Sequence, residues 1–128
     1  IIEPCGFLLD DRKLRRAGMD YRQDTQLTRH DDWTAFAGAV APARLILASA
    51  HAAEPLPEFR FAPGDIIVLG RESAGAPDYV HAACQHRVRL PLAPGRRSLN
   101  VAQAAGIFAY EACRQLDWFT DLGDHSRD

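Results

Sequence analysis

The fold is decided by three short stretches in the second half of the chain: IIVLGRESAGAP at residues 66–77, VRLPL at residues 88–92 and RSLNV at residues 97–101. Each of the first two joins an apolar run to a loop rich in Gly, Pro or Arg, and the third opens a long apolar helix. Such runs are typical of strands buried in a parallel sheet. Backbone groups at strand ends and helix starts are free to bind a ligand. The stretches therefore predict an open α/β sheet with a ligand crevice at one edge.

Alternating strands and helices are predicted along the rest of the chain. The predicted strands cover residues 1–2, 25–29, 44–49, 66–70 and 88–92; the predicted helices cover residues 10–18, the segment from Asp31 as cap to the residue before Pro42, and residues 77–84 and 99–116. Residues 51–64 contain Pro55, Pro57 and Pro63, which indicates an irregular surface connection. The last helix is apolar on almost every face, so its own sheet, a partner subunit or both should bury it. The pattern is that of a doubly wound, mostly parallel α/β domain.

Bulk composition sets limits on the class of protein. A length of 128 residues fits one domain with one core. With 47% hydrophobic and 25% charged residues the composition is that of a soluble globular protein, and no apolar run approaches the roughly 20 residues of a membrane span. The three cysteines, Cys5, Cys84 and Cys113, are odd in number and lack a CxxC spacing. We therefore expect reduced thiols, a cytoplasmic location and no membrane association.

The charge pattern restricts how this chain could bind nucleic acid. Its net charge is −2, whereas binding to phosphates normally needs a basic surface. Any RNA contact must therefore be local. The densest basic cluster comprises Arg12, Lys13, Arg15 and Arg16, and Arg96 and Arg97 form a second basic pair. The cluster is either a solvated helix face or a phosphate-binding surface that relieves the repulsion between neighbouring cations.

The order and wording of these segments resemble the SPOUT (α/β-knot) RNA methyltransferases. Besides the three stretches above, IIEPCGF at residues 1–7, DDRKLRRAGMDY at residues 10–21 and YEACRQL at residues 110–116 resemble the branch that methylates the 2′-hydroxyl of the wobble nucleotide, cytidine or uridine, of certain tRNAs. The resemblance runs from Ile1 to about Trp118. It implies a C-terminal trefoil knot that holds S-adenosylmethionine, a homodimer and a tRNA substrate.

The resemblance also implies a set of site residues. The cofactor would contact Ala48, Leu69, Gly70, Glu72, Gly75, Leu90, Leu92, Ser98 and Leu99. The catalytic residues would be Ser98, Asn100 and Glu72, and the RNA would contact Arg12, Lys13, Arg15, Arg16 and Arg97. The implied reaction is in-line transfer of the sulfonium methyl group to a ribose 2′-hydroxyl, and it requires no metal. RNA is selected because DNA lacks the hydroxyl that is methylated.

Several of these residues also have ordinary structural interpretations. Gly70 and Gly75 could be turn glycines, and Ser98 could be the N-cap of the last helix while also contacting the cofactor or a phosphate. Glu72 could be a solvated loop charge, order the knot loop, or accept hydrogen bonds near RNA. Asn100 packs poorly in the first turn of a helix but offers both a donor and an acceptor.

The sequence also bears on other functions. His81, Cys84 and His86 lack a fourth ligand at a familiar spacing, so no metal site is expected, and no triad spacing indicates hydrolysis. Members of the family normally begin with a further strand and helix, carrying an Asn-x-Gly turn and an arginine, which this sequence does not show. We therefore expect residues 1–128 to form one SPOUT domain lacking that first strand and helix. Two alternatives stay open: a catalytically silent knotted module that binds RNA or cofactor, and an unrelated nucleotide-binding domain. The second alternative has little support, because no GxGxxG or GxxxxGK[ST] motif follows a predicted strand in this sequence.

Overall fold

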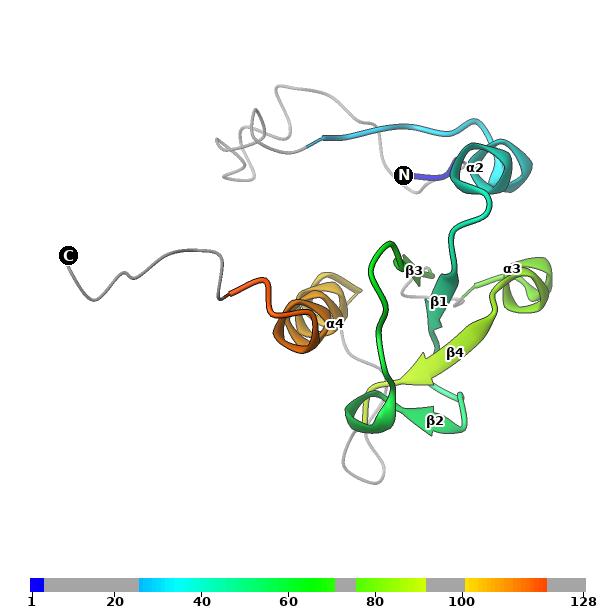
Figure 1. Ribbon diagram of the computed structural model, residues 1–128. Helices are drawn as coiled ribbons and strands as arrows, with labels where there is room; N and C mark the ends of the chain where they lie inside the picture. The colour runs from blue at the N-terminus through cyan, green and yellow to red at the C-terminus, as the bar shows by residue number, and fades with distance from the viewer. Residues whose placement is uncertain (4–25, 71–75, 92–100, 120–128) are drawn as a thin grey trace, which may run out of the picture. The chain divides into compact units, whose positions relative to one another are not determined.

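The apolar runs around Ile46 and Val68 lie side by side as strands of one sheet. The computed structural model describes residues 1–3, 26–70, 76–91 and 101–119. Within them the sheet has four strands, which are β1 (Leu45–Ala48), β2 (Glu54–Pro55), β3 (Ile66–Leu69) and β4 (His86–Arg89). Their order is β2-β4-β1-β3, and every pairing is parallel (Figure 1). The prediction of a mostly parallel sheet with helices is confirmed.

The C-terminal helix α4 (Val101–Gln115) covers one face of the sheet. Its Phe108 is 1% exposed and joins Ile46 and Val88 in the main hydrophobic cluster. Side chains of residues that pair across two strands lie on the same face of the sheet, and the face alternates along each strand. Val88 pairs with Ala48, two residues after Ile46, so Ile46 and Val88 both point toward α4. Burial of these side chains is the main force that holds α4 on the sheet.

The opposite face of the sheet is buried as well. Leu45, Leu47 and Val68 point away from α4 and are almost inaccessible to water. The short helix α3 (Asp78–Ala83) contributes the buried Val80, and Figure 1 shows α3 and α4 on opposite sides of the strands. Both faces of β1 are therefore dry, which explains why its sequence is an unbroken apolar run.

Strand β4 differs from its predicted position. The apolar pattern predicted a strand over residues 88–92, but β4 begins at His86 and ends at Arg89. Its start is fixed by pairing with β1, where His86 lies opposite Ile46, and by the Gln85 side chain, whose Oε1 accepts the N–H of Leu45 at 2.7 Å. The first residues of β4 are polar, so a hydrophobic pattern could not predict where the strand begins.

The prediction that residues 51–64 form an irregular surface connection is wrong in part. The segment contains β2 and a 3-10 helix, η2 (Leu56–Glu58). Leu56, Phe59 and Phe61 are 3%, 2% and 8% exposed and belong to the main hydrophobic cluster. The prolines do make the backbone irregular, but its apolar side chains turn inward because Phe108 and the sheet offer a surface to cover.

Gln115, at the end of α4, fastens the helix to this segment. Its side-chain Nε2 donates to the carbonyl of Phe59 at 2.8 Å, and its Oε1 accepts the N–H of Phe61 at 2.8 Å. The amide thus satisfies two backbone groups beside buried aromatic rings. A buried backbone N–H or C=O group that loses its hydrogen-bond partner lowers the stability of the folded protein.

We expect Gln115→Ala to lower the free energy of unfolding by about 2 kcal/mol, because two backbone groups lose their partners. The matched control is Gln103→Ala, an exposed glutamine of the same helix, which should change stability by less than about 0.5 kcal/mol. Urea unfolding of the two variants measures the difference. Equal effects at the two positions would show that the Gln115 amide does not fasten α4.

A second polar cluster lies at the amino ends of the strands. Arg44 Nε donates to Asp65 Oδ1 at 2.8 Å and Arg44 Nη2 to Asp65 Oδ2 at 2.5 Å. Arg44 Nη2 also donates to the carbonyl of Arg60, and Arg44 Nη1 lies 3.3 Å from Nε2 of His86. Arginine has only donors, so in a hydrogen bond between these two side chains this nitrogen of His86 is the acceptor. The cluster ties the starts of β1, β3 and β4 together.

We expect Asp65→Asn to lower the free energy of unfolding by about 2–4 kcal/mol near neutral pH, because Arg44 loses a carboxylate that is 6% exposed. Burial alone would raise the pKa of Asp65, but the hydrogen bond from Arg44, the N–H of Ala62 and nearby positive charge lower it overall. A lowered folded-state pKa adds stability above the ordinary carboxyl pKa of about 4, and that stability is lost as the pH falls through the lowered value.

Urea unfolding of wild type and Asp65→Asn from neutral to acid pH tests this expectation. The difference between them should be constant down to about pH 4 and shrink below it. Asp78→Asn, at an exposed aspartate in the first turn of α3, is the control and should cost less than about 1 kcal/mol. A difference that persists unchanged in acid would contradict the role given to the ionised carboxylate.

The chain divides by its internal contacts into two units, residues 1–41 and residues 42–128. In the first, α2 (Trp33–Val40) forms where a helix was predicted, but its cap is Asp32 and not Asp31: the Asp32 side chain accepts the N–H of Ala35 at 2.8 Å. The strand predicted over residues 25–29 is wrong for residues 26–29, which form no strand. Instead Ile2 and His30 make a single parallel bridge. The helix predicted over residues 10–18 lies outside the described residues.

Candidate functional site

Four of the predicted cofactor residues meet at one edge of the sheet. Ala48 ends β1 and lies opposite Leu69, the last residue of β3, and opposite Val88 of β4. Gly70 is the first residue after β3, and Leu90 is the first residue after β4. They lie near Ala48 because neighbouring parallel strands end at the same edge of a sheet. The N–H of Ser49 donates to the carbonyl of Val88 at 2.9 Å, which continues the pairing past the end of β1. The structure therefore brings Ala48, Leu69, Gly70 and Leu90 to the same edge.

These four residues suit a flat, apolar ligand. All four are partly buried, and none carries a charge. Ala48 and Leu90 pack against the main hydrophobic cluster, so their positions are fixed from below. Backbone groups near strand ends that take no part in the sheet pairing can read the edge of a base. The residues present therefore fit the adenine end of a nucleoside cofactor.

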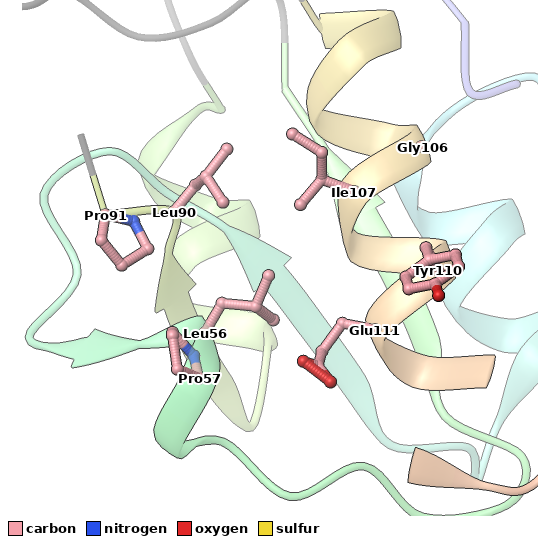
Figure 2. Close-up of a pocket in the computed structure, with 8 residues that line it drawn as sticks. All are labelled: Leu56, Pro57, Leu90, Pro91, Gly106, Ile107, Tyr110 and Glu111. Atoms are coloured by element: carbon pink, nitrogen blue, oxygen red, sulfur yellow. The ribbon is translucent and has the colours of Figure 1, made fainter. Parts of the chain in front are cut away.

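A pocket of about 380 Å³ adjoins this edge at Leu90. Figure 2 shows Leu56 and Leu90 extending toward α4, whose Ile107 and Glu111 face them. Pro57, Pro91, Gly106 and Tyr110 complete the lining. The volume falls in the range of small-molecule sites, roughly 300–1,000 Å³. The lining is apolar except for the Tyr110 hydroxyl and the Glu111 carboxylate, and that carboxylate also accepts from Arg114 Nε at 2.6 Å.

The pocket was not predicted from the sequence, apart from Leu90. Its other walls come from η2 and from the middle of α4, segments that were predicted to be an irregular connection and a buried helix. In the single chain α4 is not buried all round: Phe108 is buried, but Ile107 and Tyr110 are 40% and 62% exposed. The sheet covers one face of the helix and leaves this apolar face open.

The remaining predicted site residues lie outside the described part of the chain. They are Glu72, Gly75, Leu92, Ser98, Leu99 and Asn100 of the cofactor and catalytic sets, and Arg12, Lys13, Arg15, Arg16 and Arg97 of the RNA set. The first two groups flank described elements, since residues 71–75 follow β3 and residues 92–100 lead into α4. Their functions stay predictions.

His81, Cys84 and His86, the residues considered as metal ligands, all lie in the described part of the chain. Cys84 is 4% exposed, and burial raises the pKa of its thiol against the opposing charge of Arg87. A thiol of that kind is a weak nucleophile and a weak ligand. The His86 ring lies 5.3 Å from that of Phe59 and contacts Arg44. Among the residues that the structure describes, no group of three His, Cys, Asp or Glu side chains is arranged to hold a metal ion.

Cys84 and Cys113, the two cysteines in the described ranges, are both free thiols. None of the helices in those ranges has the length and apolar character needed to cross a bilayer.

Comparisons with known proteins identify the family of the chain. Residues 1–110 match the SpoU rRNA Methylase family. A tRNA (cytidine(34)-2'-O)-methyltransferase of Beijerinckia indica is 47% identical over 99% of this chain and 81% of its own length. The enzyme of the same description from Escherichia coli K12 is 38% identical over 92% of this chain and 76% of its own length.

Solved structures show the same likeness. A structure described as giving structural insights into the 2-OH methylation of C/U34 on tRNA has a TM-score of 0.84 and 44% identity, and covers 91% of this chain and 76% of that one. The SpoU methyltransferase AviRb of Streptomyces viridochromogenes, in complex with AdoMet, has a TM-score of 0.74 at 24% identity, over 90% of this chain and 48% of that one, and shares the fold. The resemblance expected from the sequence motifs is confirmed. The chain belongs to the SpoU methylase family.

Proposed function

We propose that this protein is an enzyme that transfers a methyl group from S-adenosylmethionine to the ribose 2′-hydroxyl of the wobble nucleotide of a tRNA. The observation that carries the proposal is the meeting of Ala48, Leu69, Gly70 and Leu90 at one sheet edge, in a chain that is 47% identical to a tRNA (cytidine(34)-2'-O)-methyltransferase. The relative's substrate is thereby assigned to this chain. The edge supplies the apolar wall that the cofactor of such an enzyme needs.

The cofactor would lie against residues from three strand ends. Ala48, Leu69 and Leu90 form the apolar wall, and Gly70 admits a close approach of the ligand to the backbone. Gly75, Leu92 and Leu99 complete the set proposed from the family motifs. When bound, S-adenosylmethionine supplies an electrophilic methyl group. The chain's own task is to hold the acceptor oxygen in line with that group and to remove or share its proton.

Three polar residues are proposed for that task. Ser98 and Asn100 precede Val101, the first residue of α4, in the sequence. Ser98 contacts the cofactor or a substrate phosphate, and Asn100 orients the ribose hydroxyl through its donor and acceptor. Glu72, two residues after Gly70, orders the loop or accepts hydrogen bonds near the RNA. No metal takes part in this scheme.

The wider assembly is proposed on the same basis. The family match spans both units of the chain, which supports one doubly wound SPOUT domain with a C-terminal trefoil knot. The exposed apolar face of α4 is the surface that a second copy would cover in a homodimer. Arg12, Lys13, Arg15, Arg16 and Arg97 bind tRNA phosphates. The enzyme acts in the cytoplasm.

A labelled-methyl assay tests the proposed function. The protein is incubated with tRNA and methyl-labelled S-adenosylmethionine, and the RNA is then hydrolysed with alkali. A 2′-O-methyl group blocks cleavage of the next phosphodiester, so the label should remain in a dinucleotide. Label on a base would overturn the ribose assignment. A folded protein that binds cofactor and tRNA without transfer would be a catalytically silent binding module instead.

A further inference from the structure

Two arginines outside every predicted basic cluster lie together on β4. Arg87 and Arg89 are two residues apart on one strand, so their side chains leave the same face of the sheet. Val88 between them points to the α4 face, and Arg87 and Arg89 therefore lie on the face that α3 shares. Figure 1 shows β4 between β1 and the short edge strand β2, whose Pro55 pairs with Arg89. A two-residue edge strand leaves little to cover them.

Both guanidinium groups are held by neutral partners. Arg87 Nη1 donates to the carbonyl of His81 at 2.9 Å, and Arg89 Nη1 donates to the carbonyl of Ala53 at 3.3 Å. Each contact uses one of the five N–H donors of an arginine and fixes the side chain without neutralising its charge. Both residues keep access to water, Arg87 the more so.

Other arginines of the chain are paired differently. Within the described ranges Arg29, Arg44 and Arg114 each form an ion pair with a carboxylate. Over the same ranges neither Arg87 nor Arg89 has a carboxylate oxygen within 4.0 Å, the distance that defines an ion pair. Glu54 of β2 lies opposite Val88 and so points to the other face. In a protein of net charge −2, two ordered guanidinium groups side by side, with no carboxylate partner among the described residues, are a local anion-binding surface.

The position of this pair identifies the anion. Arg89 immediately precedes Leu90, so the pair begins one residue from the edge where the cofactor residues gather. A nucleotide strand that places one ribose at that edge must carry its neighbouring phosphates across the adjoining surface. Planar guanidinium groups match phosphate oxygens and can bind them with two parallel hydrogen bonds.

We propose that Arg87 and Arg89 bind phosphates of the RNA strand beside the methylated nucleotide. This inference rests on the proposed function, because it takes tRNA as the substrate. It adds an RNA contact on β4 that is separate from the basic residues already proposed to bind tRNA, which are Arg12, Lys13, Arg15, Arg16 and Arg97. The contact positions the strand and carries no base specificity.

The salt dependence of tRNA binding tests this proposal. Each phosphate contact adds about 0.7–0.9 to the slope of log affinity against log salt concentration, so Arg87→Gln/Arg89→Gln should reduce the slope by about 1.4–1.8. Its affinity for tRNA should fall about tenfold or more, and its affinity for S-adenosylmethionine should stay within about twofold. The Arg87→Lys/Arg89→Lys variant keeps both charges and should keep the slope of wild type.

Two single variants serve as controls. Arg60→Gln removes an exposed arginine at the opposite ends of the strands, where its carbonyl accepts from Arg44. Arg114→Gln removes an arginine that is already paired with Glu111. Neither should change the slope. A double Gln variant with the slope of wild type would overturn the proposal, as would a folded double Lys variant that loses the slope. If wild type binds no tRNA and transfers no methyl group, it is the proposed function that fails.

Discussion

Leu90→Asp should reduce the affinity for S-adenosylmethionine about 100-fold or more. Leu90 belongs both to the sheet edge that carries the proposed cofactor residues and to the pocket beside α4. A carboxylate placed there must either stay hydrated and keep the ligand away or lose its water against an apolar surface, which is costly. Isothermal calorimetry with S-adenosylmethionine, and with its demethylated product, measures the loss.

Two further variants separate binding from folding, because Leu90 also packs on the core. Leu90→Met keeps the apolar volume and should bind within about threefold of wild type. Leu90→Ala removes the side chain without adding charge and should bind more weakly than Leu90→Met. If Leu90→Asp unfolds on heating like wild type and binds with unchanged affinity, the cofactor does not lie at this edge.

Asn100→Ala should lower the rate of methyl transfer about 100-fold and leave cofactor affinity within about threefold. The proposal gives the Asn100 amide the task of orienting the ribose hydroxyl, and loss of one well-placed group in an active site typically costs a factor of about 10² or more. Single-turnover transfer to tRNA measures the chemical step.

Gln103→Ala is the control for that variant, because it removes an exposed side-chain amide three residues further along the sequence, on α4. It should transfer at the rate of wild type. A rate for Asn100→Ala within about threefold of wild type, at saturating tRNA and cofactor, would remove Asn100 from the mechanism and leave Ser98 and Glu72 as the candidates.

Hydrophobic runs in the sequence were sufficient to predict most of the sheet. The runs that contain Ile46 and Val68 became β1 and β3, because a strand buried on both faces carries its own signal. The start of β4 could not be predicted in this way, since His86 and Arg87 are polar and their place is set by pairing with β1. A pairing between segments 40 residues apart leaves no local pattern.

The segment between β1 and β3 shows a second limit of local patterns. Its prolines correctly indicated irregular backbone, but they gave no sign that Phe59 and Phe61 turn into the core. Burial there depends on Phe108 and on the Gln115 amide, which arrive from the far end of the chain. Contacts between residues that are distant in sequence determine which side chains are buried here, and the local composition does not indicate them.

The candidate site was predictable to the extent that it follows from strand ends. Ala48, Leu69, Gly70 and Leu90 come together because parallel strands end at one edge, and this much a sequence with recognisable strands provides. The pocket behind Leu90 was not predictable, since its walls belong to η2 and to the open face of α4. Arg87 and Arg89 were missed for a similar reason. They are not adjacent in sequence, and only the alternation of a strand places them on one face.

Methyl transfer to a tRNA with a single altered ribose tests the proposed reaction most directly. The substrate carries a 2′-deoxyribose at the wobble position, and a matched tRNA carries the same change at the neighbouring anticodon position. We expect no methyl incorporation into the first tRNA and incorporation into the second, because the methylated hydroxyl itself is missing only from the first. Equal incorporation into both would contradict the assignment of the wobble 2′-hydroxyl as the acceptor.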